Sequence, residues 1–256
     1  MIREWLPQSL RIPLWGDRQK WGLIPQENDN NWTEWQRRQL EIYEVTQRKG
    51  IGTRINDAGY EVMSSLPLGN TRILEIGPGD IRHIRFWQNA PKEYLLADLR
   101  IGMLKKAESI LKNAGIPHKS LLLDRDEPLP IDDESIDFVV SFYSLEHIYP
   151  LAPYLREIHR VLKPGGVLAG AIPTEGGLAW GTGRLLTSRR WVKKNTEIDP
   201  DKIICWEHPN FADQVIDDLD NVLSRKRLEY WPFSMIALID TNLIIRFVYQ
   251  KPGLTP

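Results

Sequence analysis

The sequence predicts an α/β fold, a doubly wound and mostly parallel sheet of seven strands, and three observations lead to this prediction. From residue 71 onward, short apolar runs alternate with amphipathic helical segments, as in parallel sheets whose strands are joined by crossover helices. A turn that contains two glycines follows the first apolar run. Acidic residues stand at or near the ends of the first three runs, where a parallel sheet gathers its ligand contacts.

The strands are predicted from nearly continuous apolar runs, the pattern of strands that are covered on both faces. Five such strands are expected at residues 72–76, 93–97, 120–123, 136–142 and 167–172. Two further runs, at 228–233 and 243–249, complete the sheet of seven. The expected order of elements is therefore that of one continuous α/β core with additions at both ends.

Apolar residues at helical spacing predict the helices that cover this sheet. They mark helices over about 101–111, 151–162 and 211–222. Lys163-Pro164-Gly165-Gly166 should end the second of these and turn the chain into the next strand, because proline and glycine do not continue a helix.

The N-terminal region is expected to lie outside the sheet. Residues 1–30 contain three prolines and three tryptophans without a sustained period, which indicates an irregular arm whose tryptophans pack on the domain or cap a pocket. Asn31 with Glu34 is a capping-box pattern and predicts a helix over about 32–48 that stops at Gly50. A second helix should follow and end before Pro67.

We therefore expect residues 1–256 to form one domain. Its parts are an N-terminal helical arm and helices (1–70), a cofactor-binding core (71–172), a lid-like insertion after the fifth strand (173–207) and a C-terminal helix with two strands (208–256). The sequence carries no internal repeat. It sets no oligomeric state, although an exposed aromatic arm could pair protomers.

Composition excludes several classes of function. A net charge of -1 argues against a nucleic-acid binder. The single cysteine, Cys205, permits no intrachain disulfide and suits a cytoplasmic location. The first residues lack the apolar stretch of a secretory signal, and the apolar run near the C-terminus is broken by Asp240, Asn242 and Arg246, so neither export nor a membrane partner is expected.

The segment from Ile73 to Asp80 carries the strongest functional signal. Gly77 and Gly79 would let the backbone turn tightly and approach a ligand, and the start of a following helix would offer free amides. Asp98 ends the second strand 21 residues after Gly77, where a carboxylate can accept both hydroxyls of a ribose. Asp124 follows the third strand and could accept from an adenine amine, with Asp126 as the alternative.

With these motifs the chain resembles the class I S-adenosylmethionine-dependent methyltransferases of the type 11 group, which have a Rossmann-like fold. The matching pieces are Leu-Glu-Ile-Gly-Pro-Gly from residue 74, Leu-Ala-Asp-Leu from 96, Leu-Pro-Ile-Asp-Asp-Glu-Ser-Ile-Asp-Phe-Val-Val-Ser from 129, Ser-Leu-Glu-His-Ile from 144 and Arg-Glu-Ile-His-Arg-Val-Leu-Lys-Pro-Gly-Gly from 156. The resemblance covers roughly residues 51–172. Ile81 departs from it, since a third glycine is common there.

The resemblance implies S-adenosylmethionine as cofactor and a role for each matching residue. It implies contacts with the methionine part from Glu75, Gly77, Gly79 and the backbone around Ser141, with the ribose from Asp98, and with the purine from Leu99 and Asp124.

Methyl transfer depends mainly on positioning, but an acceptor hydroxyl or amine must also lose a proton. Glu146 and His147, beyond the fourth strand, and His208, after the insertion, are the candidate catalytic bases. The alternative for His147 is a ring that only bonds nearby backbone, and the alternative for His208 is helix capping. The remaining histidines lack ligand spacing, so no metal is expected.

The insertion contains the clearest indication of the acceptor. Arg184, Arg189, Arg190, Lys193 and Lys194 lie within eleven residues that contain no acidic side chain. Arg189 and Arg190 are the candidate contacts for a phosphate or carboxylate on the acceptor, although such a run also suits a solvated loop.

The function expected from the sequence is therefore methyl transfer to a small metabolite, with a peptide or protein acceptor as the alternative. A non-catalytic scaffold that keeps the cofactor pocket is a second alternative. A nicotinamide-dependent oxidoreductase is a third, because that fold shares the glycine turn and the strand-end carboxylate.

Overall fold

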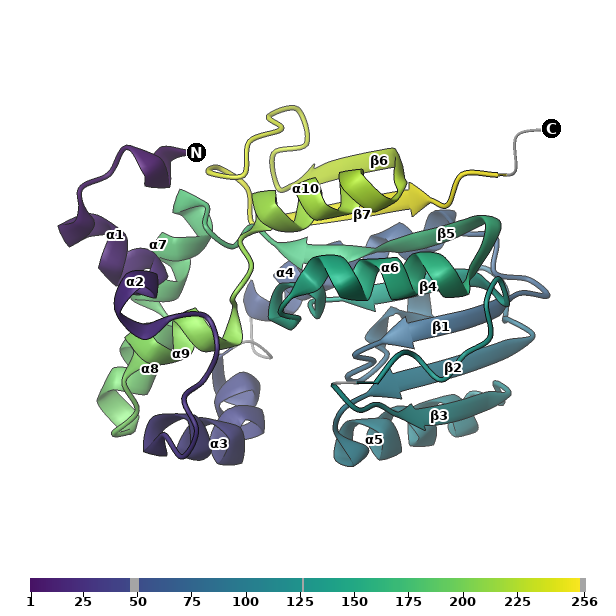
Figure 1. The fold of residues 1–256 in the computed structure, drawn as a ribbon, viewed down its shortest axis with the longest axis horizontal. Coiled ribbons are helices and arrows are strands. Elements are labelled where there is room, and N and C mark those ends of the chain that lie inside the picture. Colours follow the sequence, from purple (N-terminus) through teal and green to yellow (C-terminus); the bar gives the residue numbers. More distant parts are fainter. Residues whose placement is uncertain (47–50, 126, 254–256) are drawn as a thin grey trace.

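The computed structural model describes residues 1–46, 51–125 and 127–253 (Figure 1). Its strands form one seven-stranded sheet in the order β3-β2-β1-β4-β5-β7-β6, in which β7 is antiparallel to both neighbours and the other pairs are parallel. The strands are β1 (Arg72–Ile76), β2 (Glu93–Asp98), β3 (His118–Leu122), β4 (Ile136–Phe142), β5 (Leu162–Pro173), β6 (Ser224–Trp231) and β7 (Ile244–Gln250). The predicted fold class is confirmed.

One strand boundary differs for a clear physical reason. Lys163-Pro164-Gly165-Gly166 lies inside β5 and is not a turn before it. Leu162 pairs with Ile136, but the next paired residue of β5 is Val167, so the four residues between them bulge out of the ladder. Gly165 permits this with a φ of 77°.

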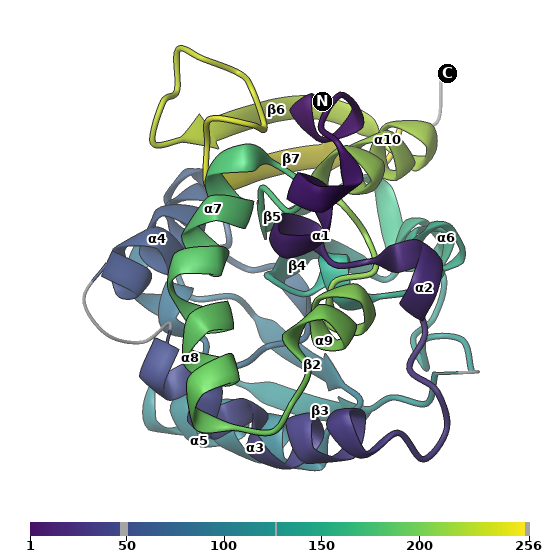
Figure 2. The ribbon, with the colours of Figure 1, turned by 90° about the vertical axis from the view of Figure 1, so that its left-hand side faces the viewer.

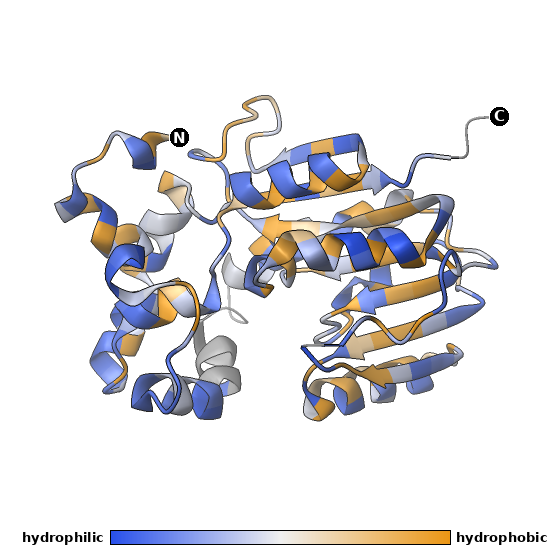
Figure 3. Ribbon diagram, in the orientation of Figure 1, coloured by the Kyte–Doolittle hydropathy of each residue, from blue (hydrophilic) through white to orange (hydrophobic). Residues whose placement is uncertain are grey.

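Helices cover both faces of the sheet and enclose two cores. On one face, α6 (Leu151–Val161) and α10 (Ala212–Val222) pack on the strands. On the other face lie α4 (Ile51–Tyr60), the 3-10 helix η2 (Glu61–Ser65) and α5 (Ile101–Asn113). Along β4, Val139 belongs to the first core and Val140 to the second, and Figure 3 shows the hydrophobic residues concentrated along the central strands.

The remaining helices gather opposite the carboxyl ends of the parallel strands (Figures 1 and 2). This helical cap consists of α1 (Gln8–Trp15), α2 (Arg18–Trp21), α3 (Asn30–Thr46), α7 (Leu178–Leu186), α8 (Ser188–Asn195) and α9 (Pro200–Glu207). The irregular structure expected for residues 1–30 is wrong, because they form η1 (Ile2–Glu4), α1 and α2, whereas the N-terminal helical arm of the predicted fold class is confirmed. Of its tryptophans, Trp15 is buried against the insertion and donates to the Gly177 carbonyl, whereas Trp5 is exposed.

The start of α3 also differs from the capping box that the sequence predicts. The Asp29 carboxylate, and not the Asn31 side chain, accepts from the first backbone amides of the helix. The Asn31 side chain instead accepts from the Asp199 amide, which ties α3 to α9. The predicted end of this helix, with Gly50, lies outside the described residues.

None of the helices in the described ranges combines the length and the apolar character needed to cross a membrane. The fold thus places one edge of the sheet, where β1, β2, β4 and β5 end, beneath the helical cap. Glu75, Gly77, Asp98, Glu146 and His147 lie at or just beyond strand ends on this edge.

Candidate functional site

The turn after β1 brings the backbone close to the carboxyl edge of the sheet. Gly77 and Gly79 adopt left-handed φ angles of 66° and 54°, which only glycine takes without steric cost. A Cβ on Gly77 would overlap Ser144 Oγ, whereas nothing lies within 4 Å of a Cβ placed on Gly79. The first glycine is therefore packed against the segment after β4, and the second leaves room for a ligand.

The segment after this turn is not the α-helix that the sequence predicts. Ile81 is buried with a φ of 46°, and a left-handed residue prevents a right-handed helix from starting at the turn. Only the five-residue 3-10 helix η3 (Arg82–Phe86) follows before β2. The helix after the turn is therefore a short 3-10 helix and not an α-helix, and backbone contacts between this segment and a ligand stay a prediction.

Glu75, just before the turn, lies in a chain of buried hydrogen bonds. It is 1% exposed, its Oε2 accepts from the Tyr94 hydroxyl at 2.7 Å, and its Oε1 lies 2.9 Å from His83 Nε2. Because Trp87 Nε1 donates to His83 Nδ1 at 3.0 Å, His83 carries its proton on Nε2 and donates to Glu75. Both carboxylate oxygens therefore have protein partners, and a direct contact with a methionine ammonium stays a prediction.

Three other predicted cofactor residues lie at the ends of β2 and β3. Asp98 is 7% exposed, and its Oδ1 accepts from the Arg100 amide at 2.8 Å. Burial raises the pKa of this carboxyl above its ordinary value. Leu99 is 44% exposed, and Asp124 is exposed two residues beyond β3, while the alternative Asp126 lies outside the described residues.

Ser141 lies inside the sheet and not at its rim. It pairs with Ile76 of β1 and with Gly170 of β5, and its side chain is fully buried. A Cβ on Gly170 would overlap the Ser141 carbonyl oxygen, which explains the glycine at that position. Contact between a cofactor ammonium and the backbone around Ser141 stays a prediction.

Two buried carboxylates follow β4 and β5 at the same edge. Glu146, in the 3-10 helix η4 (Leu145–His147), is 2% exposed, and its Oε2 has no hydrogen-bond partner in the described part of the chain. Burial is the main cause that raises the pKa of Glu146 to about 7; Glu175 and Glu207 add to the effect and His208 opposes it.

Glu175, two residues after β5, is fully buried in an ion pair. Its Oε2 lies 2.6 Å from Arg184 Nη1 and 3.0 Å from His208 Nδ1. Burial alone would raise the pKa of Glu175, but Arg184 and His208 hold it well below its usual range. For His208, burial opposes the positive charge, yet Glu175 prevails and raises its pKa.

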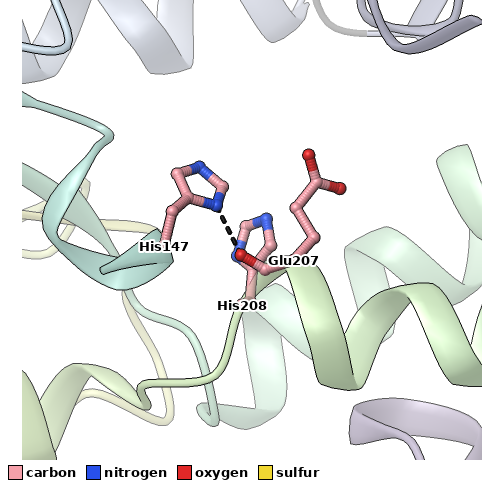
Figure 4. Close-up of side chains that lie close together, drawn as sticks. All are labelled: His147, Glu207 and His208. Atoms are coloured by element: carbon pink, nitrogen blue, oxygen red, sulfur yellow. Dashed lines mark hydrogen bonds between the residues drawn. The ribbon is translucent and has the colours of Figure 1, made fainter. Parts of the chain in front are cut away.

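His147 and His208 meet although they come from distant segments. Their ring centroids are 4.6 Å apart at an interplanar angle of 76°. His147 Nδ1 bonds to the Glu207 carbonyl at 2.5 Å (Figure 4), and burial together with His208 lowers the pKa of His147 to about 3. All three predicted bases, Glu146, His147 and His208, are thus brought together.

The basic run of the insertion does not form one patch. Arg184 points inward to Glu175, and Arg189 forms an ion pair with Asp201. Lys193 and Lys194 line an open depression of about 560 Å³ between α3 and α8. Of the two predicted acceptor contacts, Arg190 is exposed on α8, and Arg189 is already engaged.

Sequence reasoning missed two acidic residues of this site. Glu175 had a usable signal, because it follows the carboxyl end of β5 as Asp98 ends β2. Glu207 had none, since only the packing of α9 against the edge places it beside His147. The ligand atoms of His147, Glu207 and His208 lie within 4.8 Å of one another, a grouping that spacing along the chain did not indicate.

Comparison with protein families adds to this geometry. Residues 74–170 match the family described as methyltransferase domain. The match begins in β1 and ends in β5, and it includes the glycine turn and the carboxyl ends of β2 and β4. Over these residues the chain is similar to the class I S-adenosylmethionine-dependent methyltransferases. S-adenosylmethionine is the methyl donor of this class, and Gly77, Gly79 and Asp98 provide the turn and the strand-end carboxylate expected for it.

Curated relatives match about half of this chain or less, over part of their own length. The arginine-hydroxylase NDUFAF5 of Danio rerio is 32% identical over 127 residues, which are 49% of this chain and 36% of the relative. The malonyl-[acyl-carrier protein] O-methyltransferase of Salmonella typhimurium is 32% identical over 106 residues, 41% of this chain and 40% of the relative. The matched part thus spans well under half the length of these relatives.

Solved structures share the fold of the domain. A methyltransferase from Bacillus halodurans has a TM-score of 0.55 at 16% identity and covers 79% of this chain and 100% of its own. An S-adenosylmethionine-dependent methyltransferase from Mesorhizobium loti has a TM-score of 0.52 at 18% identity and covers 74% of this chain and 95% of its own. At these identities the likeness concerns the fold alone.

Proposed function

We propose that this protein transfers the methyl group of S-adenosylmethionine to a small-molecule acceptor held between the sheet edge and the helical cap. The observation that carries the proposal is the turn at Gly77 and Gly79, open above its second glycine, beside the buried Asp98 carboxylate on the next strand. A turn of this kind approaches the methionine part closely, and the carboxylate can accept from the ribose.

The acceptor class is supported by relatives that share the methyltransferase domain. They include the malonyl-[acyl-carrier protein] O-methyltransferase and a demethylmenaquinone methyltransferase of Listeria monocytogenes, 34% identical over 96 residues. A peptide or protein side chain is the second candidate acceptor, and the NDUFAF5 relatives, described as arginine hydroxylases, have a name that points to an arginine group.

Glu146, His147 and His208 are the groups that we propose for taking a proton from the acceptor, because they meet beyond the end of β4. For an anionic acceptor, the proposed contact is Arg190. Arg190→Glu should then raise the KM for that acceptor. Lys226→Glu on the distant β6 changes the net charge by the same amount and should leave the KM unchanged, so it is the control.

Calorimetry tests the cofactor directly. The protein should bind S-adenosylmethionine and S-adenosylhomocysteine and should not bind nicotinamide dinucleotides. Incubation with labelled S-adenosylmethionine and a cell extract should then label a small molecule. Label in protein would favour the second candidate, and absence of affinity for both sulfur nucleosides would overturn the proposal.

A further inference from the structure

His147, Glu207 and His208 converge on one small space beside the sheet edge. Their ligand atoms all lie within 4.8 Å of one another. Figure 4 shows the Glu207 carboxylate and the outer nitrogens of both rings extending to the same side of the backbone. We propose that these three side chains bind a divalent first-row transition-metal ion, with Zn²⁺ as the reference ion.

The Nδ1 atoms of both rings face oxygen atoms: that of His147 is hydrogen-bonded, and that of His208 lies beside a carboxylate without hydrogen-bond geometry. His147 Nδ1 lies 2.5 Å from the Glu207 carbonyl oxygen, and His208 Nδ1 lies 3.0 Å from Glu175 Oε2. Metal-binding histidines commonly donate this second N–H to a carbonyl or a carboxylate, which fixes the ring and leaves the lone pair on the other nitrogen. Here both partners leave Nε2 as the ligand atom.

A buried carboxylate beside the trio is a second, independent indication. Glu146 is 2% exposed, and its Oε2 has no hydrogen-bond partner among the residues described. Its Oε1 lies 4.0 Å from His147 Nε2. A carboxylate left without a partner in a protein interior is costly, and a cation held by His147 would offset that cost. Glu146 is therefore the candidate for a fourth ligand or for a bond to a metal-bound water.

The donor set indicates which ion is bound. Mg²⁺ and Ca²⁺ are held by oxygen ligands, whereas imidazole nitrogens suit zinc, iron and neighbouring ions. Two imidazoles with one carboxylate, and a position left open, form the ligand set of catalytic zinc sites and not of closed structural ones. The side chain of His147 is 36% exposed, so the open position is reachable from solvent.

The site adjoins the glycine turn. The His147 amide donates to the Ser144 carbonyl at 3.1 Å, and Ser144 Oγ donates to the Gly77 carbonyl at 3.3 Å. An ion here would hold an oxygen of the acceptor near the methyl donor and would occupy the ring nitrogens that otherwise take the proton, so Glu146 would be the remaining base; this consequence rests on the proposed function. Binding of the ion does not rest on it.

The test uses the untagged full chain after removal of bound metal by a chelator. Calorimetric titration should show one Zn²⁺ per chain and no binding of Mg²⁺, and Co²⁺ should give the visible absorption of a nitrogen- and oxygen-ligated ion. Loss of a group that only hydrogen-bonds a metal ligand weakens metal binding by about tenfold to a hundredfold. His147→Ala and Glu207→Gln remove a ligand itself, so each should weaken Zn²⁺ binding by at least that factor. His159→Ala, which changes a histidine outside the ligand cluster, is the control.

Glu207→Gln keeps the size of the side chain, so it guards against a result caused by misfolding, and circular dichroism checks each variant. The proposal is overturned when Zn²⁺ does not bind stoichiometrically, or when His159→Ala weakens binding as much as His147→Ala. S-adenosylhomocysteine binding, measured on the same samples without metal, separates the two proposals. Its loss together with intact Zn²⁺ binding would count against the methyltransferase proposal alone.

Discussion

The hydrogen bond from Tyr94 to Glu75 offers a sharp test of how the glycine turn is held. Tyr94→Phe removes only the hydroxyl that donates to Glu75 Oε2 at 2.7 Å, and both residues are buried, with 0% and 1% exposure. Water cannot replace the donor at such a site. A hydrogen bond to a charged group contributes about 1.5–3 kcal/mol, and we expect the free energy of unfolding to fall by that amount.

Equilibrium unfolding in urea measures this loss, with an unchanged denaturant slope as the sign that the folded state is preserved. Tyr249→Phe is the matched control. Its hydroxyl donates to Asp220 at 2.9 Å from an equally buried ring, but the Asp220 side chain is 33% exposed. Water can donate to Asp220 in place of the lost hydroxyl, so the free energy of unfolding should fall by about 1 kcal/mol or less. A Tyr94→Phe loss no larger than that of Tyr249→Phe would refute the reasoning.

Three further perturbations probe the same edge. Gly77→Ala adds a methyl group that overlaps Ser144 Oγ at a φ of 66°, and calorimetry should detect no S-adenosylhomocysteine binding; wild-type affinity would contradict this. Asp98→Asn should lower that affinity about tenfold to a hundredfold. Burial raises the pKa of the Asp98 carboxyl in the folded state, so its ionisation lowers the free energy of unfolding of the cofactor-free protein as the pH rises. In Asp98→Asn, the free energy of unfolding measured in urea should therefore depend less on pH. Arg184→Met leaves the buried Glu175 carboxylate with only His208 and Trp180 as partners and should reduce the free energy of unfolding by about 3 kcal/mol, where a loss below 1 kcal/mol would argue against a charged Glu175.

The sheet could be predicted from the sequence because its strands are covered on both faces. That burial imposes continuous apolar runs, and the bounds of β1 and β4 were predicted to the residue. Asp98 was likewise placed at the end of β2, because the period of the strand and the position of the turn fix where the carboxylate must lie.

Features that depend on contacts between distant segments could not be predicted in this way. The left-handed Ile81 replaces the expected helix with a short 3-10 helix, and an isoleucine gives no local signal for such a backbone. The arm is helical because α1 packs against α7 and α9, which its composition does not indicate. The pairing of Arg189 with Asp201 also follows from α8 meeting α9, and it removes one of the two arginines expected to contact an acceptor.

The helical cap and the sheet edge are coupled through the residues around His208. Arg18 of the arm donates to the carbonyls of His208 and Pro209 at 2.7 and 2.6 Å, and Arg184 of the insertion joins Glu175 to the Leu14 carbonyl. Arg18 of the arm and Arg184 of the insertion therefore help to position a candidate catalytic residue, although both lie outside residues 74–170. Relatives that match half of the chain or less have names as different as arginine hydroxylase and O-methyltransferase. We infer that the shared core determines the cofactor, and that the cap, which sets the surroundings of His208, determines the acceptor.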